Sequence, residues 1–169
     1  HNELKSVYTT FAGLELPNWA EENSRLLEKY DEQIPERTGF AAEFWSRIQG
    51  AEHLETRNNV GLFDLTGLSI IEVKGSAATK FVNYLCSSQM NKPVGNVMYT
   101  CWLTPKGGIR RDLAVARVAK DNYWMFVGEG TLPQDMAWVQ SFAPDGIFEG
   151  GSVQISDISN QSTGLGLWG

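Results

Sequence analysis

Asp112 is the residue whose sequence surroundings best suit chemistry, because it is a lone carboxylate in a strand of small and apolar residues. The segment Tyr99–Val118 consists of two apolar, β-branched runs on either side of Pro105-Lys106-Gly107-Gly108. Proline presets φ and glycine accepts positive φ, so these four residues predict a hairpin turn. Strand alternation then places these residues on the face of Asp112: Arg110, Ala114, Ala116 and Val118. The two alanines leave room beside Asp112, and a carboxylate next to open space suits a cationic or proton-donating ligand.

The same residues also allow a plainer interpretation. Arg110 lies two positions from Asp112 on the predicted face, and Arg111 and Arg117 are near in sequence. An exposed carboxylate in an ordinary ion pair would show the same pattern and would contribute only ~0–1 kcal/mol. The hairpin alone therefore leaves a ligand site and a surface ion pair both open.

Composition limits the classes of function. The 169 residues are 42% hydrophobic, which is enough for one globular domain. A net charge of −6 argues against nucleic-acid binding, and no apolar run reaches the ~20 residues of a membrane span. Cys86 and Cys101 form no C-x-x-C motif, and the only histidines are His1 and His53, so a zinc site is not expected. We expect a soluble protein with free buried thiols, with a single disulfide as the alternative.

The ends of the chain favour a fragment of a longer protein. The chain does not begin with Met, and it stops within the apolar run Gly164–Gly169. We therefore expect a preceding and a following part.

Local patterns predict an α+β fold, with helices packed on one face of an antiparallel sheet rather than a parallel doubly wound sheet. The predicted helices run from the N-cap Asn18 to before Pro35, over about 41–59, from the N-cap Ser76 to before Asn91, and over 132–142. The predicted strands are 61–65, which opens the core, 69–74, the hairpin 97–118, 123–127, 153–158 and 165–168.

An ordered set of motifs resembles a known family. The motifs are Val60-Gly-Leu-Phe-Asp-Leu65, Glu72-Val-Lys-Gly75, Tyr99-x-x-x-Leu103 and Lys106-Gly-Gly-Ile-x-x-Asp112. Together they resemble the folate-binding domain of glycine-cleavage aminomethyltransferases. The chain is more similar still to the C-terminal half of flavin-dependent dimethylglycine and sarcosine oxidases and dehydrogenases. That second likeness depends on Leu16–Trp19, Gly108–Arg117, and Val153–Asp157 with Gly166–Gly169.

The resemblance implies a domain organisation and a reaction. Residues 1–45 would be a helical lead-in from an upstream flavin domain that holds FAD. Residues 46–169 would be the N-terminal part of a folate-binding aminomethyltransferase-like domain, truncated at its C-terminal end. The flavin domain would oxidise a small N-methyl amine to an iminium. Tetrahydrofolate would then capture the methylene unit as 5,10-methylenetetrahydrofolate, and we expect the fragment alone to be inactive.

The resemblance also implies roles for individual residues. Asp112 matches the family's functional aspartate beside N10 of tetrahydrofolate, and Tyr99 matches a tyrosine near the pterin cavity. The residues themselves suggest two further roles: Arg110 on the same predicted face would keep Asp112 ionised, and the loop containing Gly128 and Glu129 would approach the folate, because glycines allow close backbone contact. The carboxylate would stabilise positive charge at the transferred carbon and accept the N10 proton.

Two departures keep alternatives open. Glycine-cleavage members usually carry histidine in the turn where this chain has Thr66-Gly67-Leu68. The family's pterin-anchoring acidic residue lies in a later part of the domain, outside this sequence. One alternative is a scaffold domain without folate chemistry, and another is a folate-dependent demethylase or aminomethyltransferase without flavin. We expect a cytoplasmic location, with the mitochondrial matrix as the alternative.

Overall fold

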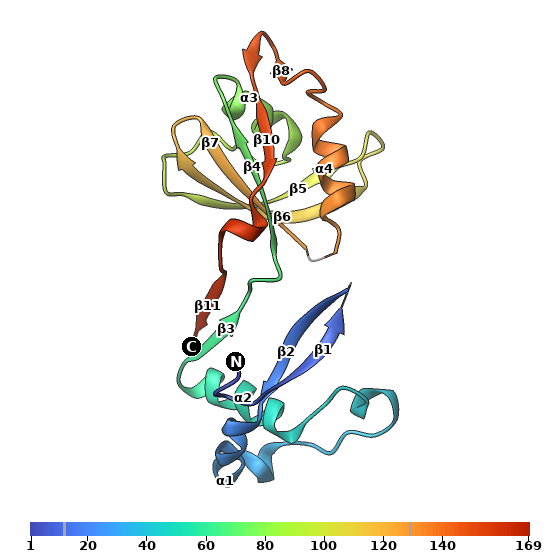
Figure 1. The fold of residues 1–169 in the computed structure, drawn as a ribbon, viewed down its shortest axis with the longest axis vertical. Coiled ribbons are helices and arrows are strands. Elements are labelled where there is room, and N and C mark those ends of the chain that lie inside the picture. The colour runs from blue at the N-terminus through green and yellow to red at the C-terminus, as the bar shows by residue number, and fades with distance from the viewer. Residues whose placement is uncertain (12, 129) are drawn as a thin grey trace. The chain divides into compact units, whose positions relative to one another are not determined.

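The chain divides into two compact units, the second of which carries Asp112 (Figure 1). The computed structural model describes residues 1–11, 13–128 and 130–169. The first unit comprises His1–Gly67 and Gly164–Gly169, and the second comprises Leu68–Thr163. The second unit is therefore inserted between two segments of the first.

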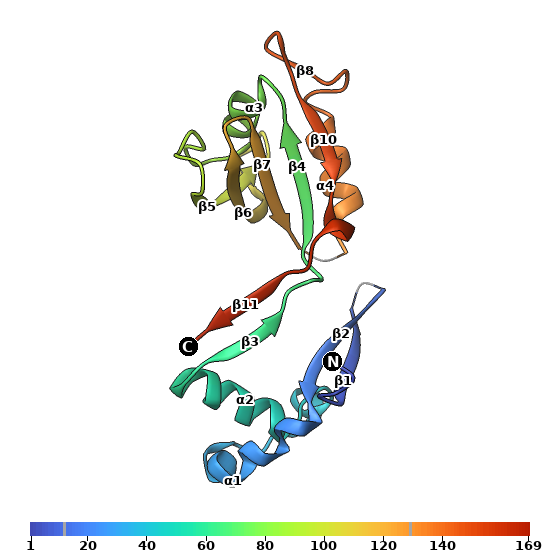
Figure 2. The same ribbon diagram turned by 60° about the vertical axis from the view of Figure 1, so that its left-hand side comes forward.

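A five-stranded antiparallel sheet with two helices forms the second unit. Its elements are β4 (Ser69–Lys74), α3 (Ala78–Leu85), β5 (Val97–Leu103), β6 (Ile109–Ala119), β7 (Asn122–Val127), α4 (Leu132–Gln140), β8 (Ile147–Phe148), β9 (Gly151–Ser152), β10 (Gln154–Asp157) and the 3-10 turn η4 (Ser159–Gln161). The sheet order is β10-β4-β7-β6-β5, which can be followed in Figure 2. The predicted α+β class with an antiparallel sheet is confirmed.

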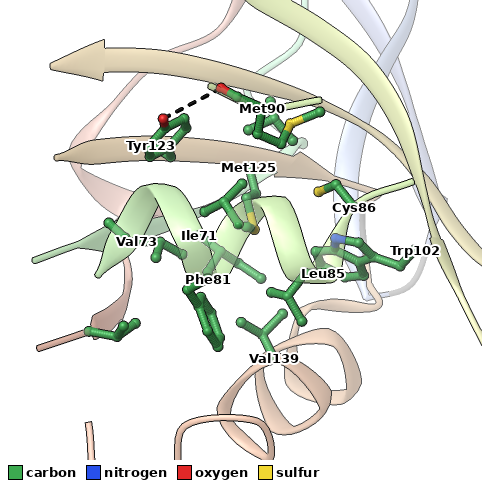
Figure 3. Close-up of a cluster of buried hydrophobic side chains, with 14 of the residues drawn as sticks. Ile71, Val73, Phe81, Leu85, Cys86, Met90, Trp102, Tyr123, Met125 and Val139 are labelled. Carbon is green, nitrogen blue, oxygen red and sulfur yellow. Dashed lines mark hydrogen bonds between the residues drawn. The ribbon is translucent and has the colours of Figure 1, made fainter. Parts of the chain in front are cut away.

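Side-chain alternation explains where the core lies. Alternate residues of β4 and β7 and the middle of β6 are buried, including Val73, Val115 and Met125, which are fully inaccessible. These side chains pack against Phe81 of α3 and Val139 of α4 (Figure 3). Both helices therefore contribute to the core on one face of the sheet. The alternate residues, including Asp112, occupy the opposite face, which we call the outer face.

Shorter elements form the first unit. They are β1 (Ser6–Phe11), β2 (Leu14–Ala20), η1 (Glu21–Leu26), α1 (Leu27–Tyr30), η2 (Asp31–Gln33), η3 (Gly39–Ala42), α2 (Arg47–Asn58), β3 (Gly61–Asp64) and β11 (Leu165–Trp168). β1 pairs with β2, and β3 pairs with β11. A small core gathers Tyr30, Ile34 and Ala51. None of the helices in the described ranges combines the length and the apolar character that crossing a membrane requires.

The predicted helix after Asn18 is confirmed as a run of short helical turns over Glu21–Gln33, but its predicted start is wrong. Residues 14–20 form β2, so Pro17 and Asn18 lie within a strand, and helical turns begin only at Glu21. Proline is tolerated here because a two-stranded ribbon has only edge strands. The strand pairing shifts register beside Tyr8, which lies opposite Pro17.

Four other boundaries or positions differ from prediction, and one of them is the end of α3, which lies at Leu85 rather than just before Asn91. α2 begins at Arg47 rather than near Ala41, because the side chain of Ser46 caps it by accepting from the N–H of Ile48. The Ser76 hydroxyl contacts Ser152 instead of capping α3. β3 does not open the core: Leu62 is 67% exposed, because β3 pairs only with β11.

Candidate functional site

The β5–β6 hairpin forms as predicted and is closed by its glycines. Gly107 has a φ of 81° and donates its N–H to the Thr104 carbonyl at 2.8 Å. The Thr104 N–H in turn donates to the Gly108 carbonyl at 2.8 Å. The two strands then pair from Val97 opposite Ala116 to Leu103 opposite Ile109.

Tyr99 and Asp112 meet on the outer face. Cys101 lies opposite Asp112 and Tyr99 lies opposite Ala114, so the two functional side chains occupy a diagonal position. The Tyr99 hydroxyl donates a hydrogen bond to Asp112 Oδ2. Both residues are exposed, and Tyr99 is 70% accessible. The structure therefore brings together two of the five predicted site residues in direct contact.

The contact has opposite effects on the two groups. The hydrogen bond from Tyr99, with help from the backbone and from the charge of Arg111, lowers the pKa of Asp112. The same hydrogen bond raises the pKa of Tyr99, because losing the phenolic proton would set two negative charges side by side. At neutral pH the pair is an ionised carboxylate that accepts from a neutral phenol.

Arg110 does not hold Asp112, contrary to the prediction. The register of β5 and β6 shifts between Trp102 and Leu103, which makes Arg110 the extra residue of a β-bulge. Its guanidinium lies over the ring of Trp138, 5.2 Å from the centroid, and donates to the Gln134 carbonyl at 3.3 Å. Both partners belong to α4, so the bulge redirects Arg110 away from the carboxylate.

The neighbouring Arg111 is also occupied elsewhere. Its Nη2 lies 3.1 Å from Oδ1 of Asp135, a residue of α4 that is completely buried. Within the described ranges the ion pairs do not include Asp112. The interpretation of Asp112 as a partner in an ordinary surface ion pair is therefore wrong.

Asp135 is a residue that the sequence analysis missed. Its carboxylate also lies 2.8 Å from the Thr131 hydroxyl, and that hydroxyl lies 2.9 Å from the Gly128 carbonyl. A signal existed: Leu132, Asp135 and Val139 share one face of the predicted helix at helical spacing. A carboxylate on a buried helical face requires partners, and sequence alone does not name them.

The loop after β7 contains the two remaining predicted residues. Gly128 follows the last residue of β7, and Thr131 anchors its carbonyl. Glu129 lies outside the described residues. The predicted roles of Gly128 and Glu129 toward a folate therefore stay predictions.

Two cavities lie within the first unit. One measures about 390 Å³ and is lined by Trp19, Glu52 and Phe63 among others, and the second measures about 310 Å³ and includes Trp45 and His53. Neither is lined by Tyr99 or Asp112.

Comparison with known proteins gives a consistent family. The GCVT N-terminal domain model matches residues 1–169. An aminomethyltransferase of Staphylococcus haemolyticus is 35% identical over 119 residues, covering 70% of this chain and 31% of the relative. An aminomethyltransferase of Halalkalibacterium halodurans is 29% identical over 145 residues, covering 85% of this chain and 38% of the relative.

The fold has a counterpart among solved structures. The crystal structure of glycine cleavage system aminomethyltransferase T from Bartonella henselae matches with a TM-score of 0.72 at 22% identity. The match covers 100% of this chain and 38% of that one, so this chain spans between 31% and 38% of these relatives. Because the family match extends over the whole sequence, the chain belongs to the GCVT N-terminal domain family.

Proposed function

We propose that this chain supplies the carboxylate side of a tetrahydrofolate-dependent one-carbon transfer. The observation that carries the proposal is the Tyr99–Asp112 pair: an ionised carboxylate held in place on an open sheet face. The family's aminomethyltransferases support the class of reaction. Because the chain spans at most 38% of those relatives, the proposal concerns the full-length protein.

Asp112 would act through its charge and its position. When bound, tetrahydrofolate supplies the nitrogens that take up the one-carbon unit. Positive charge develops as that carbon is transferred, and a fixed carboxylate lowers the energy of the charged transition state. Asp112 is also ionised and therefore able to accept a proton at Oδ1, while Tyr99 occupies Oδ2.

The residues around the pair fit a flat, partly apolar ligand. Val97 is 65% exposed and Tyr99 is 70% exposed, and both lie on the outer face. Ala114 and Ala116 occupy the same face and leave space beside them because their side chains are short. Exposed aromatic and small side chains next to one ionised oxygen suit a heteroaromatic ring that carries N–H donors.

A second candidate concerns the source of the one-carbon unit. The turn Thr66-Gly67-Leu68 replaces the histidine-containing turn usual in glycine-cleavage members, which favours an N-methyl amine as the donor and an FAD-containing flavin domain as the partner. The relatives above are aminomethyltransferases, which favours transfer without flavin. The division into a lead-in over 1–45 and a folate domain from 46 belongs to the flavin-linked candidate.

Substitution of Asp112 by Asn tests the proposal. In the full-length protein we expect formation of 5,10-methylenetetrahydrofolate from an amine donor to fall by about 100-fold or more. Folding should be unaffected, because the side chain is exposed. The matched control is Asp145→Asn in an exposed loop, which should keep the wild-type rate.

Binding and rate together separate the alternatives. Calorimetric titration of tetrahydrofolate into the full-length wild type should show binding, and its absence would favour a scaffold domain. Wild-type rates in the Asp112→Asn variant would remove Asp112 from the mechanism. If transfer from the amine donor requires bound FAD, the flavin-linked candidate is favoured. If transfer proceeds without FAD, direct aminomethyl transfer is favoured.

A further inference from the structure

The strands β6 and β7 separate next to the site. Their pairing ends with Ala114 opposite Phe126. Asp112 lies two residues beyond Ala114 on one strand, and Gly128 lies two residues beyond Phe126 on the other. Asp112 and Gly128 therefore lie at the same end of the ladder, beyond the last paired residues of the two strands.

A partly buried side-chain network spans this separation. Arg111 reaches Asp135 Oδ1 with Nε at 3.3 Å and Nη2 at 3.1 Å. Asp135 Oδ2 lies 2.8 Å from the hydroxyl of Thr131, which lies 2.9 Å from the Gly128 carbonyl. The path thus runs from the residue next to Asp112, through the fully buried Asp135, to the end of β7.

Desolvating the charges of this network costs free energy that a purely structural contact would not need to spend. Asp135 is fully buried and the Arg111 side chain is 25% exposed, so the ion pair loses much of its solvation. Apolar residues of similar volume often stabilise a fold as well as a desolvated ion pair or better. A hydrogen-bonded ion pair, unlike an apolar contact, fixes the relative position of its two side chains, because its hydrogen bonds form in only one arrangement of the partners. Arg110 adds a second contact from β6 to α4, over Trp138.

We propose that Asp135 is a positioning residue: through Arg111 and Thr131 it fixes the Asp112 segment of β6 relative to Gly128 at the end of β7. Its importance for one-carbon transfer rests on the function proposed above. Its effect on the geometry of Asp112 does not, because the Tyr99–Asp112 contact can be observed without any folate.

The first variant replaces the pair by apolar residues, Arg111→Met with Asp135→Leu. This exchange removes the directional contacts but leaves no unpaired buried charge. We expect a melting temperature equal to or above that of the wild type. We also expect the pKa of Tyr99 to fall toward its ordinary value, because Asp112 no longer stays within reach of the phenol.

The charge change must be separated from displacement of Asp112. Loss of the Arg111 cation would by itself raise the pKa of Tyr99, and loss of the Asp135 anion would lower it. A fall in Thr131→Val, in which both charges remain, therefore reports displacement of Asp112. The measurement is a ¹³C NMR titration of tyrosine ring carbons, with Tyr99→Phe to assign the signal.

Transfer by the full-length protein gives the second measurement. We expect kcat to fall on the order of tenfold to a hundredfold with little change in the KM for folate, because a displaced Asp112 affects the chemical step. The control is Arg117→Met in the same strand, whose guanidinium binds the Lys92 and Lys120 carbonyls at 2.6 Å. Its Tyr99 titration and its kcat should match the wild type.

Thr131→Val decides the matter, whether or not the double variant folds. Valine matches the shape of threonine, both charges remain, and the Thr131 hydroxyl makes no capping bond to α4. A fall in the pKa of Tyr99 in Thr131→Val supports the proposal, and an unchanged Tyr99 titration in that variant overturns it, whatever the transfer rate. A wild type without transfer activity would overturn the proposed function alone, because the Tyr99 titration would still test the positioning role.

Discussion

The phenol of Tyr99 on β5 and the carboxylate of Asp112 on β6 form a diagonal pair in which the phenol donates and the carboxylate accepts. The pair requires the observed register of the hairpin, since one strand supplies each member. A shift of one residue in the pairing would turn the side chains of one strand to the other face and place Tyr99 and Asp112 on opposite faces. The turn at Gly107 and Gly108 therefore contributes to the site although neither residue touches it.

Tyr99→Phe should raise the pKa of Asp112. The Tyr99 hydrogen bond is the largest cause that lowers this pKa, so its loss moves the pKa back toward the ordinary value of an aspartate. The lowered pKa favours the folded state above the unfolded pKa, and this contribution is lost as pH falls through the folded value; the variant should lose it. ¹³C titration of the aspartate carboxyl carbons measures the change. Tyr8→Phe, in β1, is the control, and an Asp112 midpoint that does not move would contradict the hydrogen bond.

Cys86 should resist alkylation in the folded protein. Burial raises the pKa of its thiol to about 12, so the thiolate fraction at pH 8 is on the order of one in ten thousand. Cys101 is only half-buried on the outer face, and both thiols are free. Iodoacetamide followed by mass spectrometry should modify Cys101 first and Cys86 only in denaturant. Equal labelling rates of the two cysteines in the native protein would contradict the buried position of Cys86.

Gly75→Ala should destabilise the second unit more than Gly95→Ala. Both glycines have positive φ, 134° and 90°, so both variants carry backbone strain. A Cβ at Gly75 would also lie 2.3 Å from the Ser152 carbonyl oxygen, whereas nothing lies within 4 Å at Gly95. We expect the difference in unfolding free energy to exceed about 1 kcal/mol, from urea denaturation curves. Equal midpoints would show that the backbone at Ser152 gives way without cost.

Phe81→Ala should cost about 3–5 kcal/mol of unfolding free energy, because the ring is fully buried between the sheet and Phe148. Tyr84→Ala, three residues later on the same helix and 61% exposed, is the matched control and should cost clearly less. Thermal or urea unfolding of both variants measures the contrast. A small effect of Phe81→Ala would mean that α3 does not close the core as described.

Local chemistry explains which parts of the fold were predictable. The β5–β6 hairpin follows from a Pro-Gly-Gly turn between alternating runs, and α4 follows from Pro133 in its first turn. Asp112 and Tyr99 could be placed on one face because strand periodicity is fixed. The β1–β2 ribbon was missed because Pro17 and Asn18 resemble the start of a helix, and only its pairing with β1 makes the segment a strand.

The errors at the site have a non-local origin. Strand alternation assigned Arg110 to the face of Asp112, but the bulge opposite Trp102 and Leu103 shifts that alternation. Nothing between residues 109 and 118 announces the bulge, which depends on how β6 meets α4. Asp135 was missed for the same reason, since its partners lie on a strand and a loop distant in sequence.

The ribbon of β3 and β11 has a consequence for the order of folding. Its strands are joined only through the whole of Leu68–Thr163, and the N–H of Leu65 donates to the Gly164 carbonyl at 2.8 Å. Pairing of β3 with β11 in an unfolded chain would carry the entropic cost of closing that long loop. Once the inserted unit has folded and fixed its own two ends, closure becomes a short-range event, so the ribbon should acquire protection from amide exchange after the five-stranded sheet of the second unit.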